Sequence, residues 1–405
     1  MDAPVLVAMK NIFAPCSLGS LRLKNRILRA ATHEGMGRAD GMPTDGLSRT
    51  YEKLAAGGAG AIITGYVGVK QNGRTFANMR MFDGEQYVEV YRAMNERLKP
   101  LGTPVILQLA HGGTRSHASL SGQEVVGPSF RQRNEYGDVC READEEEIRS
   151  IIQAFVRAIV NAKKALFDGV ELHAAHGYLL SEFISPVLNK RRDDWGGPLA
   201  NRMRIVREIL LQAREEVGDF PLLVKISARD EDPRGITEDD AVEMARILKE
   251  SSCDAVEVSC GYGDFFNTVR MTGLPVDAIL HFAPGYRDLP NLRKRMMKLG
   301  TFFTGKGRKP LHNYNVDMAE RIKKEVDIPV IAVGGIRNLQ DINNIITERN
   351  IDFVSLSRPF VIEPDIVERF RTGSQERSRC IDCGYCLIGV TSGPLRCYYG
   401  RVPRT

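Results

Sequence analysis

The sequence predicts a (β/α)8 barrel, the TIM-barrel fold, followed by a short cysteine-rich extension. Three observations support this fold class. Short apolar runs typical of buried strands alternate eight times with longer amphipathic runs typical of helices. Polar residues and glycines follow most of the apolar runs, as expected where barrel strands end at a functional mouth. Four of the eight cysteines lie close together, between residues 380 and 397.

The expected strands are short and are spread along the chain: 26–31, 61–64, 104–109, 169–172, 222–227, 255–259, 329–333 and 353–356. Helices are expected between most of them, at 50–56, 85–99, 145–166, 199–217, 237–250, 316–326 and 339–348. Asp144 and Thr237 are predicted N-caps, because each precedes a run of acids that suits a helix N-terminus. An open doubly wound sheet is the alternative fold, but no GxGxxG turn follows Ala31.

Composition limits the class of protein. The chain has 405 residues, of which 43% are hydrophobic and 26% charged, as in ordinary soluble proteins. We expect a barrel over residues 1–370 and a cysteine-rich tail over 371–405. No run of 18 or more apolar residues occurs and no secretory leader is evident, so a cytoplasmic protein without a membrane partner is expected. The net charge of +5 is too small to indicate nucleic-acid binding.

The most informative stretch spans residues 169–197. Its buried strand leads into His173, His176 and Tyr178. Two imidazoles can hold an oxygen atom and stabilise negative charge on it, and a nearby phenol can deliver a proton. Histidines that only satisfy the core are the alternative, but this spacing at a strand-to-helix turn favours a catalytic site. Zinc is disfavoured, because a third ligand and an HExxH helix are missing.

The ends of the last two expected strands indicate a phosphate site. Gly334 and Gly335 follow the seventh strand, and Ser357 and Arg358 follow the eighth. In (β/α)8 barrels these two loops often bind phosphate through backbone N–H groups. Glycines allow close backbone approach, and Arg358 offers a forked donor. Taken alone, the two glycines could form a simple turn, and Arg358 could be a surface charge. Together they predict a cofactor that bears a phosphate.

The cysteine tail predicts a metal site. Cys380, Cys383 and Cys386 are spaced three residues apart, and Cys397 is more remote. This spacing is typical of a [4Fe–4S] cluster. Zinc is the second choice, because structural zinc sites more often use two CxxC pairs. Four thiols that bind no metal are the third alternative.

A long, basic connection is expected at about 261–312. Its second half, 287–309, holds eight Lys and Arg residues against one acid, Asp288. By the barrel rule it begins at the catalytic mouth, so we hypothesise a lid that selects an anionic substrate or a nucleotide phosphate. A solvated basic surface helix is the alternative. Its first half supplies groups suited to stacking and polar contact: Tyr262, Phe265, Phe266 and His281.

Several segments resemble the old yellow enzyme family of FMN-dependent oxidoreductases. They are FAP at 13–15, LGSLRLKNRI at 18–27, QLAH at 108–111, ELHAAHGYL at 171–179, and DWGG at 194–197 with Asn201 and Arg202. The resemblance covers nearly the whole chain. The cysteine tail resembles the subgroup that contains 2,4-dienoyl-CoA reductase and trimethylamine dehydrogenase. Their C-terminal nucleotide-binding domain is expected to be missing here.

The resemblance implies roles for individual residues. His173 and His176 would bind the substrate carbonyl over the flavin, and Tyr178 would protonate the substrate. Two departures from relatives concern Lys225, where many have Arg, and His33, where they often have Thr or Cys. The remaining implied contacts are to the flavin ring by Ala30, Ala31, Thr32, Gly65 and Gln108, to its N1 and O2 edge by Lys225, to the FMN phosphate by Gly334, Gly335, Ser357 and Arg358, and to substrate by Tyr66.

The expected function is therefore that of an ene-reductase, in which NADH or NADPH reduces FMN and the flavin passes hydride to an α,β-unsaturated carbonyl compound. An anionic substrate, a separate electron-donor protein and an oligomer are expected candidates. The alternatives are an FMN-dependent amine dehydrogenase or demethylase on the same site, a Schiff-base lyase that uses Lys225, and a non-catalytic electron-transfer protein built around the cysteine cluster.

Overall fold

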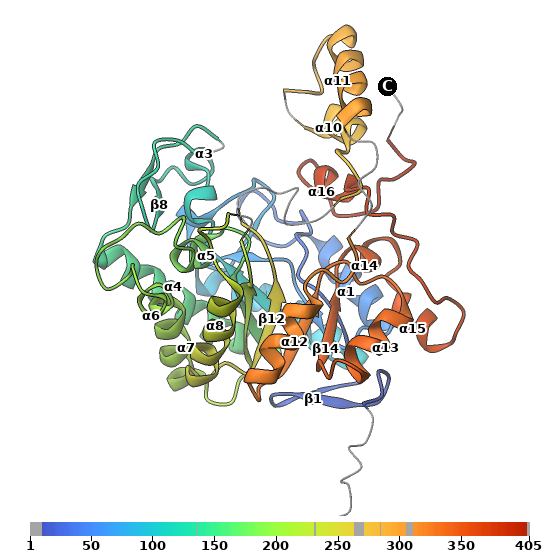
Figure 1. The fold of residues 1–405 in the computed structure, drawn as a ribbon, viewed down its shortest axis with the longest axis horizontal. Helices are drawn as coiled ribbons and strands as arrows, with labels where there is room; N and C mark the ends of the chain where they lie inside the picture. The colour runs from blue at the N-terminus through green and yellow to red at the C-terminus, as the bar shows by residue number, and fades with distance from the viewer. Residues whose placement is uncertain are drawn as a thin grey trace, which may run out of the picture.

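The parallel strands close into a barrel (Figure 1). The computed structural model describes residues 10–134, 136–230, 232–262, 271–283, 285–304 and 311–402. Within these residues eight parallel strands form the ring, because β14 pairs with β3 and β10 pairs with β7. The strands are β3 (Ile27–Arg29), β4 (Ile62–Ile63), β7 (Val105–Ala110), β10 (Gly169–Ala174), β11 (Leu222–Ser227), β12 (Ala255–Ser259), β13 (Val330–Val333) and β14 (Phe353–Leu356). The predicted fold is confirmed, and each strand agrees within two residues at either end.

Helices cover the outside of the ring (Figure 1). Asp144 and Thr237 both form capping boxes, which confirms the two predicted N-caps. The predicted helix at 199–217 is broken at Met203. The outer helices are α1 (Asp45–Ala56), α2 (Val88–Leu98), α4 (Glu145–Lys164), α6 (Leu199–Arg202), α7 (Arg204–Val217), α8 (Glu238–Glu250), α12 (Val316–Glu325), α13 (Leu339–Thr347), α14 (Arg358–Ile362) and α15 (Ile366–Arg371).

Further short elements close or extend the barrel. The antiparallel hairpin of β1 (Cys16–Leu18) and β2 (Leu21–Leu23) contributes buried side chains to the same cluster as Ile106 and Leu223, which point into the ring. The remaining elements are β5 (Val67–Gly68), β6 (Arg80–Met81), β8 (Val125–Gly127), β9 (Cys140–Glu142), α3 (Ala118–Ser121), α5 (Leu179–Ile184), η1 (Gln71–Gly73), η2 (Glu85–Tyr87), η3 (Lys99–Leu101) and η4 (Gly113–Arg115).

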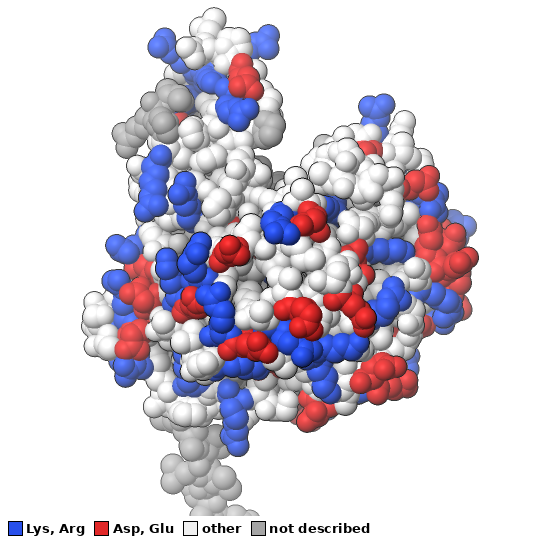
Figure 2. Space-filling view, turned by 180° about the vertical axis from the view of Figure 1, so that it is seen from behind, with Lys and Arg blue, Asp and Glu red and all other residues white. Residues whose placement is uncertain are grey.

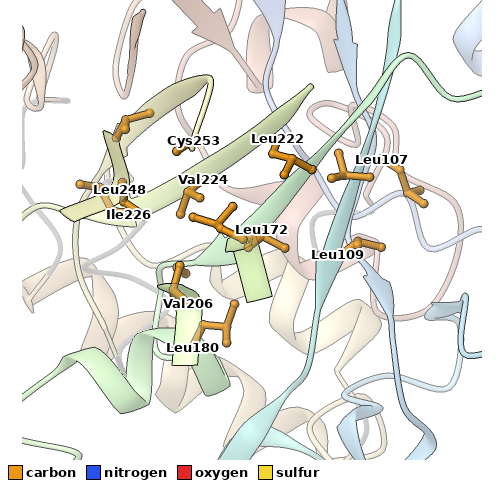
Figure 3. Close-up of a cluster of buried hydrophobic side chains, with 14 of the residues drawn as sticks. Leu107, Leu109, Leu172, Leu180, Val206, Leu222, Val224, Ile226, Leu248 and Cys253 are labelled. Atoms are coloured by element: carbon orange, nitrogen blue, oxygen red, sulfur yellow. The ribbon is translucent and has the colours of Figure 1, made fainter. Parts of the chain in front are cut away.

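The main core lies between the strands and the outer helices. Figure 3 shows Leu172, Val224 and Ile226 with Val206 and Leu248, which come from helices. Successive strand residues point to opposite faces. Leu172 therefore packs outward, and its neighbours Glu171 and His173 face the interior of the barrel. The outward residues hold the fold together, and the inward residues are left for chemistry.

The basic connection after β12 projects away from the barrel (Figure 1). It contains α10 (Val276–Phe282) and α11 (Asn291–Thr304), and α10 packs against α16 (Tyr385–Gly389) of the cysteine-rich tail. Phe265, Phe266 and Lys309 lie outside the described residues. No helix in the described part of the chain is long and apolar enough to cross a membrane.

Leu172→Ala should lower the free energy of unfolding by about 2–5 kcal/mol, because Leu172 is 0% exposed and its loss leaves a cavity between β10 and the helices. Urea denaturation followed by circular dichroism measures this. Leu211→Ala is the control, since Leu211 is 36% exposed on α7 and should change stability by much less. Equal effects of the two substitutions would contradict this assignment of the core.

Candidate functional site

One cavity opens at the C-terminal ends of the barrel strands. Its empty volume is about 1330 Å³. The structure brings together nearly all of the predicted flavin and substrate residues on its walls: Ala30, Ala31, Thr32, Tyr66, Gln108, His173, His176, Tyr178, Lys225, Gly334, Gly335, Ser357 and Arg358. Gly65 does not line the cavity. Its N–H donates to Glu34 Oε1 at 2.8 Å and its carbonyl accepts from Arg80 Nη2 at 2.7 Å, within a buried ionic network.

The two histidines and Tyr178 converge at one end of this cavity. The ring centroid of His173 lies 5.0 Å from those of both His176 and Tyr178. His176 adopts a positive φ of 66°, which turns the chain sharply after β10. Its Nε2 lies 2.7 Å from Ser259 Oγ. The hydroxyl of Tyr178 donates to that of Tyr66 at 3.3 Å.

Both imidazoles are uncharged at neutral pH. Burial, together with His176 and Lys225, lowers the pKa of His173 well below its usual value. Burial, Lys225 and Arg115 lower the pKa of His176 to about 3. Nδ1 of His173 is buried, and the ring makes no hydrogen bond with the described residues. The histidines can therefore serve as neutral hydrogen-bond partners for a ligand in the cavity.

A ladder of buried polar side chains crosses the barrel interior below the histidines. Lys225 Nζ lies 2.5 Å from Glu257 Oε2, and Gln108 Nε2 donates to Glu171 Oε1 at 2.6 Å. Burial opposes the charge on Lys225, but the attraction of Glu257 and Glu171 raises its pKa above the usual value. Burial and Glu257 raise the pKa of Glu171 well above its usual value, so this carboxyl holds a proton. Sequence analysis did not identify Glu171 and Glu257 as site residues, because their contacts depend on strand register.

The opposite end of the cavity is suited to a phosphate. A Cβ at Gly335 would lie 2.6 Å from the carbonyl oxygen of Leu311, so only glycine fits there. Arg358 Nη1 lies 2.9 Å from Asp382 Oδ1, and Arg337 forms an ion pair with the same carboxylate. Arg337 lines this end of the cavity and was missed by sequence reasoning, although it follows Gly334 and Gly335 closely. Two guanidinium groups and a glycine turn fit a phosphate group.

The cysteine-rich tail forms part of the same site. Leu387, Val390 and Leu395 of the tail line the cavity at the barrel mouth, which sequence reasoning also missed. Cys380, Cys383, Cys386 and Cys397 line a neighbouring cavity with an empty volume of about 400 Å³. Burial raises the pKa of the Cys386 thiol to about 12. The described residues contain no group of three or more His, Cys, Asp or Glu side chains placed to hold one metal ion.

None of the described residues of the basic connection lines the cavity. Arg293, Lys294 and Arg295 are not among the lining residues, and neither are Tyr262 and His281. An ion pair of 2.5 Å between Lys298 and Asp277 joins α11 to α10 instead. Figure 2 shows Lys and Arg side chains around this projection, in agreement with a solvated basic helix rather than the hypothesised lid.

Comparisons with known proteins agree on one family. Residues 11–263 match the profile of the NADH:flavin oxidoreductase / NADH oxidase family. The chain is 30% identical over 385 residues to a "metal reductase" of Desulforamulus reducens, covering 94% of this chain and 52% of the relative, so it spans about half the length of that relative. It is 31% identical over 355 residues to an "NADPH dehydrogenase" of Bacillus pumilus, covering 87% of this chain and 92% of the relative.

The fold also has solved counterparts. An old yellow enzyme homologue from Zymomonas mobilis superposes with a TM-score of 0.73 at 23% sequence identity, covering 95% of this chain and all of that structure, 100%. At this level of identity the likeness concerns the fold.

A buried acid, Glu182, links two segments of the cavity wall next to Tyr178. Glu182 lies one turn further along α5 and is 1% exposed. The N–H of Thr114 donates to Glu182 Oε2 at 3.0 Å, and the Thr114 hydroxyl donates to the same carboxyl group. Burial raises the pKa of Glu182 to about 7. No sequence pattern predicts this contact, which joins residues 68 positions apart.

The raised pKa of Glu182 makes stability depend on pH. The carboxyl group of Glu182 loses its proton at about pH 4.5 in the unfolded chain but only at about pH 7 in the folded chain. The stability that comes from binding this proton in the folded state is therefore fully present below pH 4.5 and is lost as the pH rises to about 7. Between pH 5 and pH 8, Glu182→Gln should gain about 2 kcal/mol of stability relative to the wild type. Urea unfolding at both pH values measures this. Exposed Glu216→Gln is the control, and parallel curves for Glu182→Gln and the wild type would contradict the expectation.

Proposed function

The chain belongs to the NADH:flavin oxidoreductase / NADH oxidase family, as its resemblance to the old yellow enzymes predicts, and from this premise we propose that it is an FMN-dependent ene-reductase. The substrate is an α,β-unsaturated carbonyl compound. Its β-carbon gains a hydride and its α-carbon a proton, while NADH or NADPH is oxidised. One observation supports this proposal above the others: two neutral imidazoles and a phenol meet at one end of a cavity whose other end is suited to a phosphate.

The residues of the cavity fit FMN. The glycine turn at Gly334 and Gly335, with Ser357, Arg358 and Arg337, would hold its phosphate. Gln108 and Lys225 would meet the polar edge of the ring, and the backbone at 30–32 would lie along it. Bound FMN supplies hydride transfer between NAD(P)H and the alkene.

The side chains of this protein bind and polarise the substrate. His173 and His176 can donate N–H groups to the carbonyl oxygen, where negative charge develops, and each such donor typically contributes a few kcal/mol in a water-poor site. They do so as neutral groups, because their pKa values are lowered by burial. The hydroxyl of Tyr178 is the proton donor to the α-carbon. Its hydrogen bond to Tyr66, which in turn contacts Thr75 Oγ1 at 3.1 Å, orients the phenol.

The rival functions receive less support. A Schiff-base lyase needs an uncharged lysine, but Lys225 is paired with Glu257 and its pKa is raised. An amine dehydrogenase or demethylase must bind a cationic substrate. The cavity is lined by Arg115, whose charge disfavours such a cation. A non-catalytic electron-transfer protein would not need the convergent imidazoles and phenol.

We propose that the cysteine-rich tail, residues 371–405, holds a [4Fe–4S] cluster beside the barrel of residues 1–370, with zinc as the second choice. The support is the cysteine spacing and the single cavity that all four residues line. A bound cluster supplies one-electron transfer, which makes a separate electron-donor protein a candidate partner.

Tyr178→Phe should leave flavin reduction by NAD(P)H unchanged and slow reoxidation by an enone by about 10²–10⁴-fold, because the variant lacks the proton donor. Anaerobic stopped-flow measurement of the two half-reactions with 2-cyclohexenone separates these steps. Tyr286→Phe, which alters an exposed tyrosine that lines neither cavity, is the matched control. Reoxidation of the Tyr178 variant at the wild-type rate would show that another group is the acid.

Protein purified without air should contain about four iron atoms and as many labile sulfides for each chain. Cys383→Ser should lose most of this iron, since it removes one of four thiolates, while Cys253→Ser should keep it, because Cys253 is buried in the barrel. Elemental analysis and the visible spectrum measure both. One zinc atom in place of iron would favour the second choice, and the absence of both metals would contradict the site.

A further inference from the structure

One cation in the cavity wall, Arg115, contacts the ring of Tyr178. Arg115 ends η4, directly after β7, and is partly buried in the cavity wall. Its Cζ lies 6.0 Å from the centroid of the Tyr178 ring. Among the described residues its guanidinium makes no hydrogen bond and no ion pair. The donors of this guanidinium group are therefore free to bind a ligand in the cavity.

Arg115 is held firmly in this position. The preceding residue, Thr114, is bonded through its N–H and its hydroxyl to Glu182 of α5. The N–H of Leu179, at the start of α5, donates to the carbonyl of His111 at 3.0 Å. Arg115 and Tyr178 therefore belong to one packed unit, and the distance between them is set by the fold rather than by a mobile loop.

The charges around Arg115 favour an anion. Lys225 and Arg115 both lower the pKa of His176, so this end of the cavity is electropositive. The nearest acid on α5 is Glu182, whose carboxyl is occupied by Thr114 and whose pKa burial raises to about 7. Arg131 also faces this acid and donates to Thr114 Oγ1 at 3.1 Å. Glu182 also attracts Arg115, but no described carboxylate forms an ion pair with it.

We propose that Arg115 forms an anion-binding subsite beside Tyr178 that binds a carboxylate of the substrate. The preferred substrate is then an unsaturated carbonyl compound that also bears a carboxylate. This inference rests on the proposed function and adds the charge of the substrate to it. The planar guanidinium can bind a carboxylate through two parallel hydrogen bonds, which fixes the orientation of the substrate as well as its affinity. Orientation decides which alkene carbon faces the phenol.

Binding can be tested without turnover. The probes are 4-oxopentanoate and its methyl ester, which differ in charge and cannot be reduced at an alkene. Calorimetric titration of the oxidised holoenzyme should show tighter binding of the acid. Arg115→Gln should weaken binding of the acid about 10- to 100-fold and leave binding of the ester unchanged. Arg115→Lys should retain part of the preference, and Arg133→Gln, which removes an exposed arginine outside this cavity, should behave as the wild type.

Turnover of a second matched pair separates this inference from the proposed function. Reduced enzyme is reoxidised with 4-oxopent-2-enoate or its methyl ester. If Arg115→Gln loses binding of the acid and the wild type reduces neither compound, the subsite is supported and the ene-reductase function is rejected. Reduction of both compounds with no dependence on Arg115 would support the ene-reductase and overturn the subsite.

A nucleotide phosphate is the other source of an anion. If Arg115→Gln raises KM for NADPH but not for NADH, and acid binding is unchanged, the guanidinium serves the nucleotide and the inference is overturned. Unchanged KM values for both nucleotides, with weakened acid binding, support it. The flavin spectrum and melting temperature of each variant establish that the fold is intact.

Discussion

The buried ammonium of Lys225 sets the electrostatics of the site. Strand register pairs it with Glu257 and His173, and it pairs Glu171 with Gln108 on the same interior face. A buried cation requires a close counter-charge, and Glu257 provides it at 2.5 Å. Burial and the nearby charge of Glu257 raise the pKa of Glu171. The charged lysine then contributes to the lowered pKa of His176. The neutrality of the site imidazoles therefore follows in part from an ion pair in the layer below.

The cysteine-rich tail is structurally joined to the cavity that it borders. Asp382 lies between two of the cysteines, is 2% exposed, and adopts a positive φ of 59°. Its carboxylate binds Arg337 and Arg358, the two arginines at the phosphate end. A phosphate in that corner and Asp382 both attract the same guanidinium groups. Arg358 also lines the cysteine cavity, so the two sites share a wall. Any change in the arrangement of the cysteines therefore reaches the phosphate end through one carboxylate.

The sequence predicted those features that depend on local pattern. Buried strands, the two capping boxes and the cluster at His173, His176 and Tyr178 are encoded within a few neighbouring residues, and the fold places that cluster on the cavity wall. The features that it missed depend on contacts between distant segments. Glu182 meets Thr114, and Asp382 meets Arg337, only because the barrel closes. The described residues do not support the lid hypothesis, because charge composition does not predict the direction in which a helix projects. Gly65 lies behind the cavity because Glu34 and Arg80 occupy its backbone groups.

The cations of the cavity lie at separate positions, so each can bind a different negatively charged group. Arg337 and Arg358 lie at one end, Lys225 in the interior layer, and Arg115 beside Tyr178. Between them the imidazoles are neutral, because burial disfavours the imidazolium. Under the proposed function, these oriented donors would meet negative charge that develops on a carbonyl oxygen, and Arg115 would meet a permanent negative charge. A carboxylate bound there also lies near the face of the Tyr178 ring and competes for the cation above it. Substrate charge and phenol orientation are therefore coupled at a single side chain.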